Sequence, residues 1–231
     1  MSGNIQKPRF LYTLLEARVP FEIGAQLLSR RFYEKSLPQG NGRPVIVIPG
    51  FGAGDFETRM LRKSLRRLGY RSVPWKMGRN MGSNSENRAH LRSELTRLNG
   101  LTGQKVSIVG WSLGGVFARE LGRTFPEDVH SVVSLGTPFN GDHDANILHD
   151  IFHRLSGSEF SSDDLTAFNQ RKEPPGVIST SIYSKSDGVV SWQCSLEKET
   201  ELTENVEVIS SHCGLVFNPF AVSALAHALY K

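Results

Sequence analysis

The sequence VSIVGWSLGG at residues 106–115 decides the fold of this chain. It starts as an apolar, β-branched run typical of a buried strand, and it then breaks into the pattern Gly-x-Ser-x-Gly at Gly110, Ser112 and Gly114. Residues 116–121 continue the apolar pattern and predict a helix. A strand, a tight turn that carries a serine, and a helix form the context of a nucleophile elbow. Because the two glycines lack a Cβ atom, the strand and the helix can approach closely at this turn.

From residue 44 onward, strand-like and helix-like segments alternate around this stretch. The expected strands lie at residues 45–48, 70–75, 106–111, 128–135, 177–183 and 205–209. The expected helices lie at residues 56–68, at 85–98 with a stop at the Asn-Gly pair that follows, after the serine turn, and at 219–230. Strands separated by helices indicate βαβ units, and hence an α/β fold with a mostly parallel sheet covered by helices on both faces.

We expect one domain over residues 1–231, with N-terminal helices in 8–33 and a small helical cap inserted at 139–175. The cap is predicted because this segment is rich in polar residues and interrupts the alternation of strands and helices. We expect it to cover the functional site.

In a parallel sheet of this kind, functional groups lie on the loops that follow the carboxyl ends of the strands. A serine needs a base to accept its proton, and the base needs a carboxylate to orient it. Of the seven histidines, only His212 directly follows an expected strand. Asp187 lies in the turn after the preceding strand, and Asp142 is a competing carboxylate that also follows a strand end. The chain order Ser112, Asp187, His212 favours Asp187 as the catalytic acid.

A serine nucleophile also needs two backbone N–H groups that bind the negative oxygen formed during the reaction. Leu113 follows the nucleophile and should provide one of them, and Phe51 in the first glycine-rich turn should provide the other. That turn, residues 49–54, has neither the Gly-Lys-Ser/Thr ending of a phosphate loop nor the G-x-G-x-x-G pattern. The sequence therefore does not favour nucleotide binding.

Five short motifs support the same interpretation. They are Pro-Gly-Phe at 49–51, Gly-Trp-Ser-Leu-Gly-Gly at 110–115, Gly-Thr-Pro-Phe at 136–139, Ser-Asp-Gly-Val-Val at 186–190 and Ser-His-Cys-Gly at 211–214. In combination they resemble the α/β-hydrolase superfamily, and more narrowly the bacterial lipase- and esterase-like hydrolases, over residues 44–230. Many lipases carry His-Gly at the first motif, where this chain has Pro49.

The resemblance implies an eight-stranded type of core, trimmed at its N-terminal edge. It also implies a carboxylic-ester hydrolase (EC 3.1.1.-) that forms an acyl-enzyme and acts on a hydrophobic, lipid-like ester. An acyltransferase or a thioesterase is the alternative on the same fold. A non-catalytic binding protein of this fold is less favoured, because such a chain should lack a member of the triad.

The N-terminal helices contain one apolar face, formed by Phe21, Ala25, Leu28 and Phe32 at helical spacing. We expect this face to pack on the domain or to line the mouth of the site. The alternative is contact with a membrane surface, because basic residues flank the apolar ones. These are Arg9, Arg18, Arg30, Arg31 and Lys35.

Composition sets further limits. Lys and Arg total 27 against 23 Asp and Glu, and the small excess is spread along the chain, so nucleic-acid binding is not expected. The N-terminus has no uninterrupted apolar core of a signal peptide, and no apolar run of 18 residues exists, so we expect a cytoplasmic protein. The oligomeric state is not indicated.

Two pairs of residues have metal-binding or cross-linking potential. Cys194 and Cys213 lie near the proposed acid and base, and they are either a disulfide or two free thiols. His149 and His153 could share a helix face as metal ligands, but no zinc-protease pattern surrounds them. We expect no metal and no cofactor.

Overall fold

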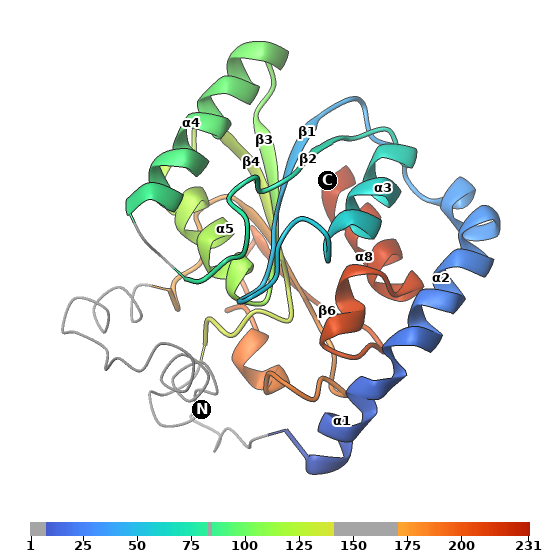
Figure 1. Ribbon diagram of the computed structural model, residues 1–231. Helices are drawn as coiled ribbons and strands as arrows, with labels where there is room; N and C mark the ends of the chain where they lie inside the picture. Colours follow the sequence, from blue (N-terminus) through green and yellow to red (C-terminus); the bar gives the residue numbers. More distant parts are fainter. Residues whose placement is uncertain (1–7, 83–84, 141–170) are drawn as a thin grey trace.

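The structure is a computed structural model that describes residues 8–82, 85–140 and 171–231 (Figure 1). Its centre is a six-stranded sheet in the order β2-β1-β3-β4-β5-β6, and every neighbouring pair of strands is parallel. The strands are β1 Pro44–Ile48, β2 Arg71–Val73, β3 Val106–Trp111, β4 Val129–Leu135, β5 Ile178–Tyr183 and β6 Thr203–Glu207. The predicted parallel sheet is confirmed, with six strands in the described part of the chain.

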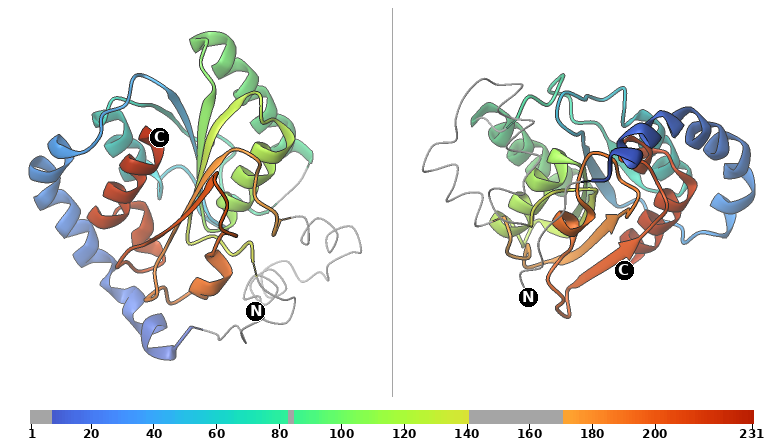
Figure 2. Two further views of the ribbon diagram at one scale, coloured as in Figure 1. Left: turned by 180° about the vertical axis from the view of Figure 1, so that it is seen from behind. Right: turned by 90° about the horizontal axis from the view of Figure 1, so that it is seen from below.

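Helices cover both faces of the sheet (Figures 1 and 2). One layer contains α3 (Arg59–Arg67) and α8 (Pro219–Tyr230), with α2 (Val19–Tyr33) packed outside it against α8. The opposite layer contains α4 (Ser85–Thr102) and α5 (Leu113–Thr124). The remaining helices are short: α1 Phe10–Leu15, η1 Glu16–Arg18, η2 Glu34–Ser36, η4 Trp192–Ser195 and η5 Cys213–Val216.

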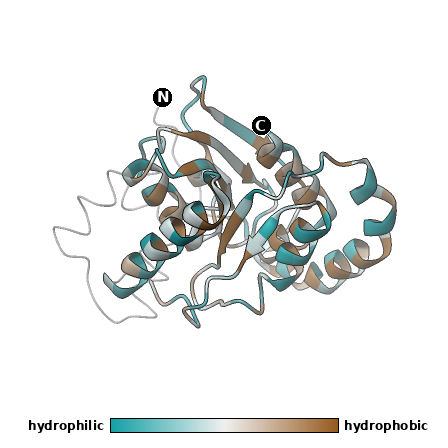
Figure 3. Cartoon of the chain, turned by 90° about the horizontal axis from the view of Figure 1, so that it is seen from above, coloured by the Kyte–Doolittle hydropathy of each residue, from teal (hydrophilic) through white to brown (hydrophobic). Residues whose placement is uncertain are grey.

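The continuous apolar run of β1 fits its position between the two layers. Val45 and Val47 belong to the core cluster that contains residues of α3 and α8, whereas Ile46 and Ile48 belong to the cluster that contains residues of α4 and α5. A strand buried on both faces needs apolar residues at successive positions rather than at alternate ones. Figure 3 shows these hydrophobic strands between the two layers of helices.

Two predicted helices differ from the observed ones at their ends, and the first of them, expected at 56–68, is shorter as α3. The helix expected at 85–98 continues to Thr102 as α4, so Gly100 lies within it. Termination occurs at Gly103, which adopts a left-handed conformation with φ of 64° and donates its backbone N–H to the carbonyl of Asn99. Glycine adopts this conformation without a steric cost, and it commonly ends helices in this way.

The orientation of α2 contradicts the prediction from its apolar pattern. The side chains of Phe21, Leu28 and Phe32 are 80%, 78% and 82% exposed, while Glu22 and Gln26 on the opposite side are buried. The expectation that the apolar face packs on the domain is therefore wrong. The buried polar residues have hydrogen-bond partners in the domain, described below, and these partners determine which face of the helix points inward.

A buried ion pair joins α5 to the loop after β5. Arg119 and Glu197 have fully buried side chains and hydrogen-bond to each other. The Arg119 guanidinium lies 3.7 Å from the centre of the Phe139 ring and donates to the carbonyl of Glu173 at 2.9 Å. This one side chain therefore contacts the chain at both ends of the predicted cap. Most of that cap, residues 141–170, lies outside the described residues.

We predict that Arg119→Met lowers the free energy of unfolding by about 3–5 kcal/mol, because it leaves the Glu197 carboxylate buried without its partner. The measurement is urea denaturation followed by circular dichroism. The double variant Arg119→Met/Glu197→Leu should regain much of the loss. Lys185→Met, which breaks the exposed 2.7 Å pair of Lys185 with Glu207, is the control and should cost at most about 1 kcal/mol. Equal effects of Arg119→Met and Lys185→Met would contradict the prediction.

Candidate active site

Ser112 lies at a strained turn between β3 and α5. Its φ of 53° and ψ of −124° place it in a region that non-glycine residues rarely adopt. A Cβ atom at Gly110 would clash with the backbone of Gly114, and one at Gly114 would clash with the carbonyl of Ile48. The turn therefore requires both glycines, and it presses the start of α5 against the end of β1. The predicted elbow geometry is present.

His212 and Asp187, which are 25 residues apart in the chain, meet at the same edge of the sheet. The Nδ1 atom of His212 lies 2.7 Å from Oδ2 of Asp187, and both side chains are almost fully buried. The other carboxylate oxygen of Asp187 accepts backbone N–H groups from Val189 at 2.9 Å and Val190 at 2.7 Å. With both oxygens occupied, the carboxylate is held in one orientation toward the imidazole.

Trp111, the residue before Ser112, supports the histidine from the elbow side. Its ring lies 5.8 Å from the imidazole, measured between centroids, and its indole N–H donates to the backbone carbonyl of His212 at 3.1 Å. Gly136, at the end of β4, has φ of 54° and passes close to the acid and the base. A Cβ atom there would lie 3.1 Å from Oδ2 of Asp187 and 3.2 Å from Nδ1 of His212.

A carboxylate from the N-terminal segment links the loops of the acid and the base. Oε1 of Glu16 accepts the backbone N–H of His212 at 2.8 Å and that of Gly188 at 3.0 Å, and Oε2 accepts the N–H of Cys213 at 3.2 Å. Gly188 directly follows Asp187, so one side chain fixes both loops at once. Glu16 is not among the site residues predicted from the sequence. The available signal was an acidic residue among otherwise apolar positions of the N-terminal helices.

Glu22, six residues further along the chain, binds the loop that carries His212 as well. It accepts the backbone N–H of Ser211 at 2.9 Å and the side-chain amide of Asn218 at 3.0 Å, and it also bonds to the Ser211 hydroxyl. A Cβ atom at Gly214 would clash with the Glu22 carboxylate. The inward face of the N-terminal segment is therefore polar because it binds the loop that carries His212.

The charges around His212 raise its pKa. Burial by itself would lower the pKa, but the charge of Asp187, the hydrogen bond to that carboxylate and the charge of Glu16 together outweigh burial. The protonated imidazole is therefore favoured in the folded state relative to the unfolded chain. The stabilisation that follows is complete below the ordinary pKa of about 6.5 and is lost as the pH rises through the higher folded value.

The turn predicted to bind the oxyanion lies against the elbow. A Cβ atom at Gly50 would approach the Cβ of Ser112 to 3.1 Å. Among the described residues, the backbone N–H groups of Phe51 and Leu113 have no hydrogen-bond acceptor, so both donors remain available. The turn that carries Phe51 therefore lies against the elbow, in which Leu113 directly follows Ser112.

Asn80, in the loop between β2 and α4, fixes this turn. Its fully buried side-chain amide donates to the carbonyl of Pro49 at 2.8 Å. Its backbone carbonyl accepts from Gly52 and its backbone N–H donates to Ala53, both at 2.8 Å. The turn therefore has support although Pro49 stands where many lipases have histidine.

The two cysteines are free thiols. Burial raises the pKa of both Cys194 and Cys213 to about 11, so both thiols stay protonated near neutral pH. The competing carboxylate Asp142 and the histidine pair at 149 and 153 lie outside the described residues. In the described part of the chain, no group of three or more His, Cys, Asp or Glu side chains is arranged to hold a metal.

We predict that Glu16→Gln lowers the pKa of His212, because it removes a negative charge that favours the imidazolium. The measurement is an NMR titration of the imidazole protons. Asp187→Asn should lower the pKa further, since it removes both the closer charge and a charged hydrogen-bond partner. Glu204→Gln, at an exposed ion pair with Lys231, is the control and should leave the pKa unchanged. An unaltered or raised pKa in Glu16→Gln would show that Glu16 does not act on His212 by charge.

Neither a model of a known protein family nor a curated protein sequence matches this chain. Solved structures do match it. Lipase B of Aspergillus fumigatus is 16% identical with a TM-score of 0.64, covering 84% of this chain and 54% of the lipase, so the chain spans about half of that protein. The monoacylglycerol lipase of Paleococcus ferrophilus is 14% identical with a TM-score of 0.60, covering 84% and 95%.

A thioesterase domain from the curacin biosynthetic pathway is 13% identical with a TM-score of 0.59, covering 82% of this chain and 92% of that domain. The structural neighbours thus include lipolytic enzymes, an esterase and a thioesterase. At such low identities the agreement concerns the arrangement of strands and helices. Together with the parallel sheet and the strained turn at Ser112, it shows that this chain has the α/β-hydrolase fold.

Proposed function

We propose that this protein is a serine hydrolase that cleaves carboxylic esters through an acyl-enzyme. The observation that carries the proposal is the pairing of His212 with Asp187 at 2.7 Å at the sheet edge where Ser112 occupies its strained turn. A buried acid–base pair beside an elbow serine is the arrangement that serine acyl transfer needs. The ester-cleaving activity of the structural neighbours on this fold agrees with it.

In the first half of the reaction, the Ser112 hydroxyl attacks the ester carbonyl and its proton passes to Nε2 of His212. The carbonyl carbon becomes tetrahedral, and its negative oxygen accepts the N–H groups of Phe51 and Leu113. Asp187, which binds Nδ1, holds the imidazole in the required tautomer and stabilises the imidazolium. His212 then gives the proton to the leaving alkoxide, which departs as an alcohol while the acyl group stays on Ser112.

In the second half, water repeats the same steps. His212 accepts a proton from water, the resulting hydroxide attacks the acyl-serine, and the carboxylic acid leaves as His212 returns the proton to Ser112. If an alcohol takes the place of water, the same intermediate gives ester exchange, and a thioester can replace the ester in the first half. A thioesterase among the structural neighbours keeps that second candidate open.

We predict that wild-type protein hydrolyses p-nitrophenyl esters and that Ser112→Ala lowers kcat/KM by about 10⁴-fold or more, because the nucleophile is lost. The measurement is release of p-nitrophenol over a series of acyl-chain lengths. Longer acyl chains should be preferred if the natural ester is hydrophobic. Asp187→Asn should lower kcat by about 10⁴-fold, because the imidazole then adopts the wrong tautomer. Asp142→Asn is the matched control and should stay active.

Absence of hydrolysis by wild type for every ester, or full activity of Ser112→Ala, would rule out the proposal. Full activity of Asp187→Asn together with inactive Asp142→Asn would move the acid to the other carboxylate. Product analysis in the presence of an alcohol acceptor, with a matched thioester series beside it, separates hydrolysis of esters from acyl transfer and from thioester cleavage.

We predict that Asn80→Ala lowers kcat by about 10-fold to 100-fold while KM changes little, because the turn that carries Phe51 loses its buried support. The unpaired carbonyl of Pro49 should also lower the free energy of unfolding by about 1–3 kcal/mol. Esterase kinetics and urea denaturation measure the two effects. Asn41→Ala, in an exposed loop, is the control. A stability loss with unchanged kcat would show that Asn80 supports the fold alone.

A further inference from the structure

The outward face of the N-terminal helices is apolar. The largest exposed side chains of α1 and α2 are Phe10, Leu11, Leu14, Phe21, Leu28 and Phe32, and four of these six are more than three-quarters exposed. We call this surface the apolar stripe. Single exposed apolar residues are ordinary on a protein surface, but a group that shares one helix face, as Phe21, Leu28 and Phe32 do in α2, usually marks an interaction site.

Polar contacts on the other side of the N-terminal segment fix the stripe in its outward orientation. Glu16 and Glu22 bind the loop that carries His212, as described above. Further along α2, the amide of Gln26 donates to the Ser64 hydroxyl of α3 at 3.2 Å. Turning α2 over to bury the stripe would break these hydrogen bonds, and the apolar side chains of the stripe could not replace them. The helix therefore keeps its apolar side free for another surface.

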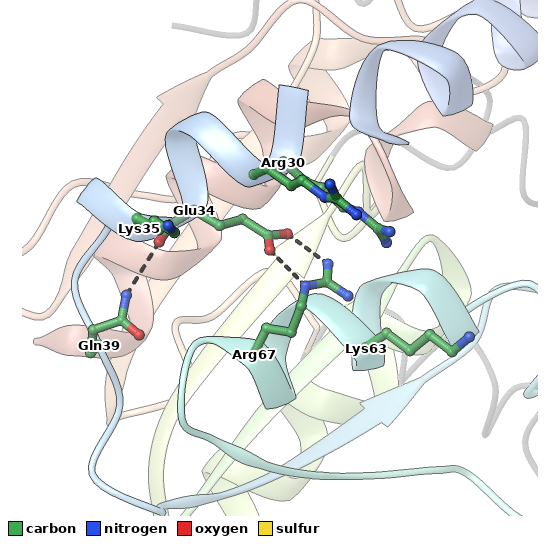
Figure 4. A pocket seen from close by; sticks show the side chains of 7 residues that line it. Arg30, Glu34, Lys35, Gln39, Lys63 and Arg67 are labelled. Carbon is green, nitrogen blue, oxygen red and sulfur yellow. Dashed lines mark hydrogen bonds and ion pairs between the residues drawn. The ribbon is translucent and has the colours of Figure 1, made fainter. Parts of the chain in front are cut away.

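Positive charges gather where the stripe ends. Arg30, Arg31, Lys35 and Lys63 line an open groove of about 880 Å³ between α2 and α3 (Figure 4). The groove also contains Arg67, but its guanidinium makes two 2.7 Å bonds with Glu34. The other four side chains, those of Arg30, Arg31, Lys35 and Lys63, form no ion pair with a carboxylate in the described part of the chain. Their charge is therefore available to an anionic partner.

We propose that the apolar stripe and the basic groove together bind the surface of an anionic phospholipid bilayer. The apolar side chains would enter the boundary between headgroups and acyl chains, and the four cations would contact the phosphate-bearing headgroups. A helix with one apolar face and lysine or arginine beside it binds lipid interfaces in this way. A second copy that docked through the same face fits the surface less well, because it would place the same four cations against those of the first copy.

The arrangement also places the reaction site near the bound lipid. The hydroxyl of Thr13 in α1 donates to the carbonyl of Gly188, and Glu16 binds the loops of both His212 and Asp187. The stripe is therefore attached directly to the edge of the sheet where Ser112 lies. None of the helices in the described residues has the length and apolar content needed to cross a bilayer.

The test is sedimentation of full-length Ser112→Ala protein with vesicles of phosphatidylcholine alone or with 30 mol% phosphatidylglycerol (a fraction of roughly this size gives a strongly negative surface). We expect binding to the anionic vesicles that weakens with added salt. Phe21→Ser/Phe32→Ser should lower the partition coefficient by about tenfold or more. Lys35→Gln/Lys63→Gln should lower it by about tenfold.

Matched controls change the same residue types elsewhere. Leu101→Ser alters an exposed apolar residue of α4 on the opposite layer, and Lys105→Gln/Lys198→Gln removes two positive charges outside the groove. Both should leave vesicle binding unchanged. Phe21→Ser/Phe32→Ser, made with Ser112 intact, should keep its rate on a short-chain, water-soluble ester.

Lack of binding to anionic vesicles would overturn the proposal. So would equal binding to both vesicle types, or equal losses in stripe variants and control variants. A dimer in gel filtration that Phe21→Ser/Phe32→Ser converts to a monomer would assign the stripe to a second copy instead. Because the vesicle assay uses inactive protein, its outcome is separate from the outcome of the ester assays.

Discussion

The carboxylate of Glu16 is the constraint on which the geometry of the site depends. It accepts backbone N–H groups from both sides of the site, from Gly188 in the acid loop and from His212 and Cys213 in the base loop. These loops follow β5 and β6, and they are also bonded directly to each other, because the Ser184 hydroxyl donates to the carbonyl of Ser210 at 2.7 Å. A charged acceptor shared between them makes stronger bonds than neutral groups would, and it adds a second connection between the loops that carry Asp187 and His212.

The strand-end rule explains why the central part of the fold and site could be predicted from sequence. Continuous β-branched runs identify the buried strands, and carboxyl ends of parallel strands meet at one edge. Ser112, Asp187 and His212 each follow such an end, so their proximity required only the correct strand order. Asp187 and His212 meet because β5 and β6 are neighbours in the sheet and each residue lies a few positions after the end of its strand.

The supporting residues could not be found in this way. Helical periodicity shows which residues share a face of α2, but it does not show which face points toward the domain. That choice depends on Ser211 and Asn218, almost 200 residues away, which offer Glu22 its donors. Asn80 is a similar case, because a polar residue in a loop has no periodic signal and its role depends on the carbonyl of Pro49 being buried beside it.

Holding a helix by its polar side has a consequence for the whole molecule. A buried carboxylate such as Glu22 is tolerated only when its hydrogen bonds are complete, so its contacts, with those of the partly buried Glu16, resist displacement of the N-terminal helices. An apolar interface of the same size could slide or repack at smaller cost. The orientation of the exposed apolar stripe is thus tied to the position of His212. A surface that binds the stripe is therefore held in one fixed orientation relative to the reaction site.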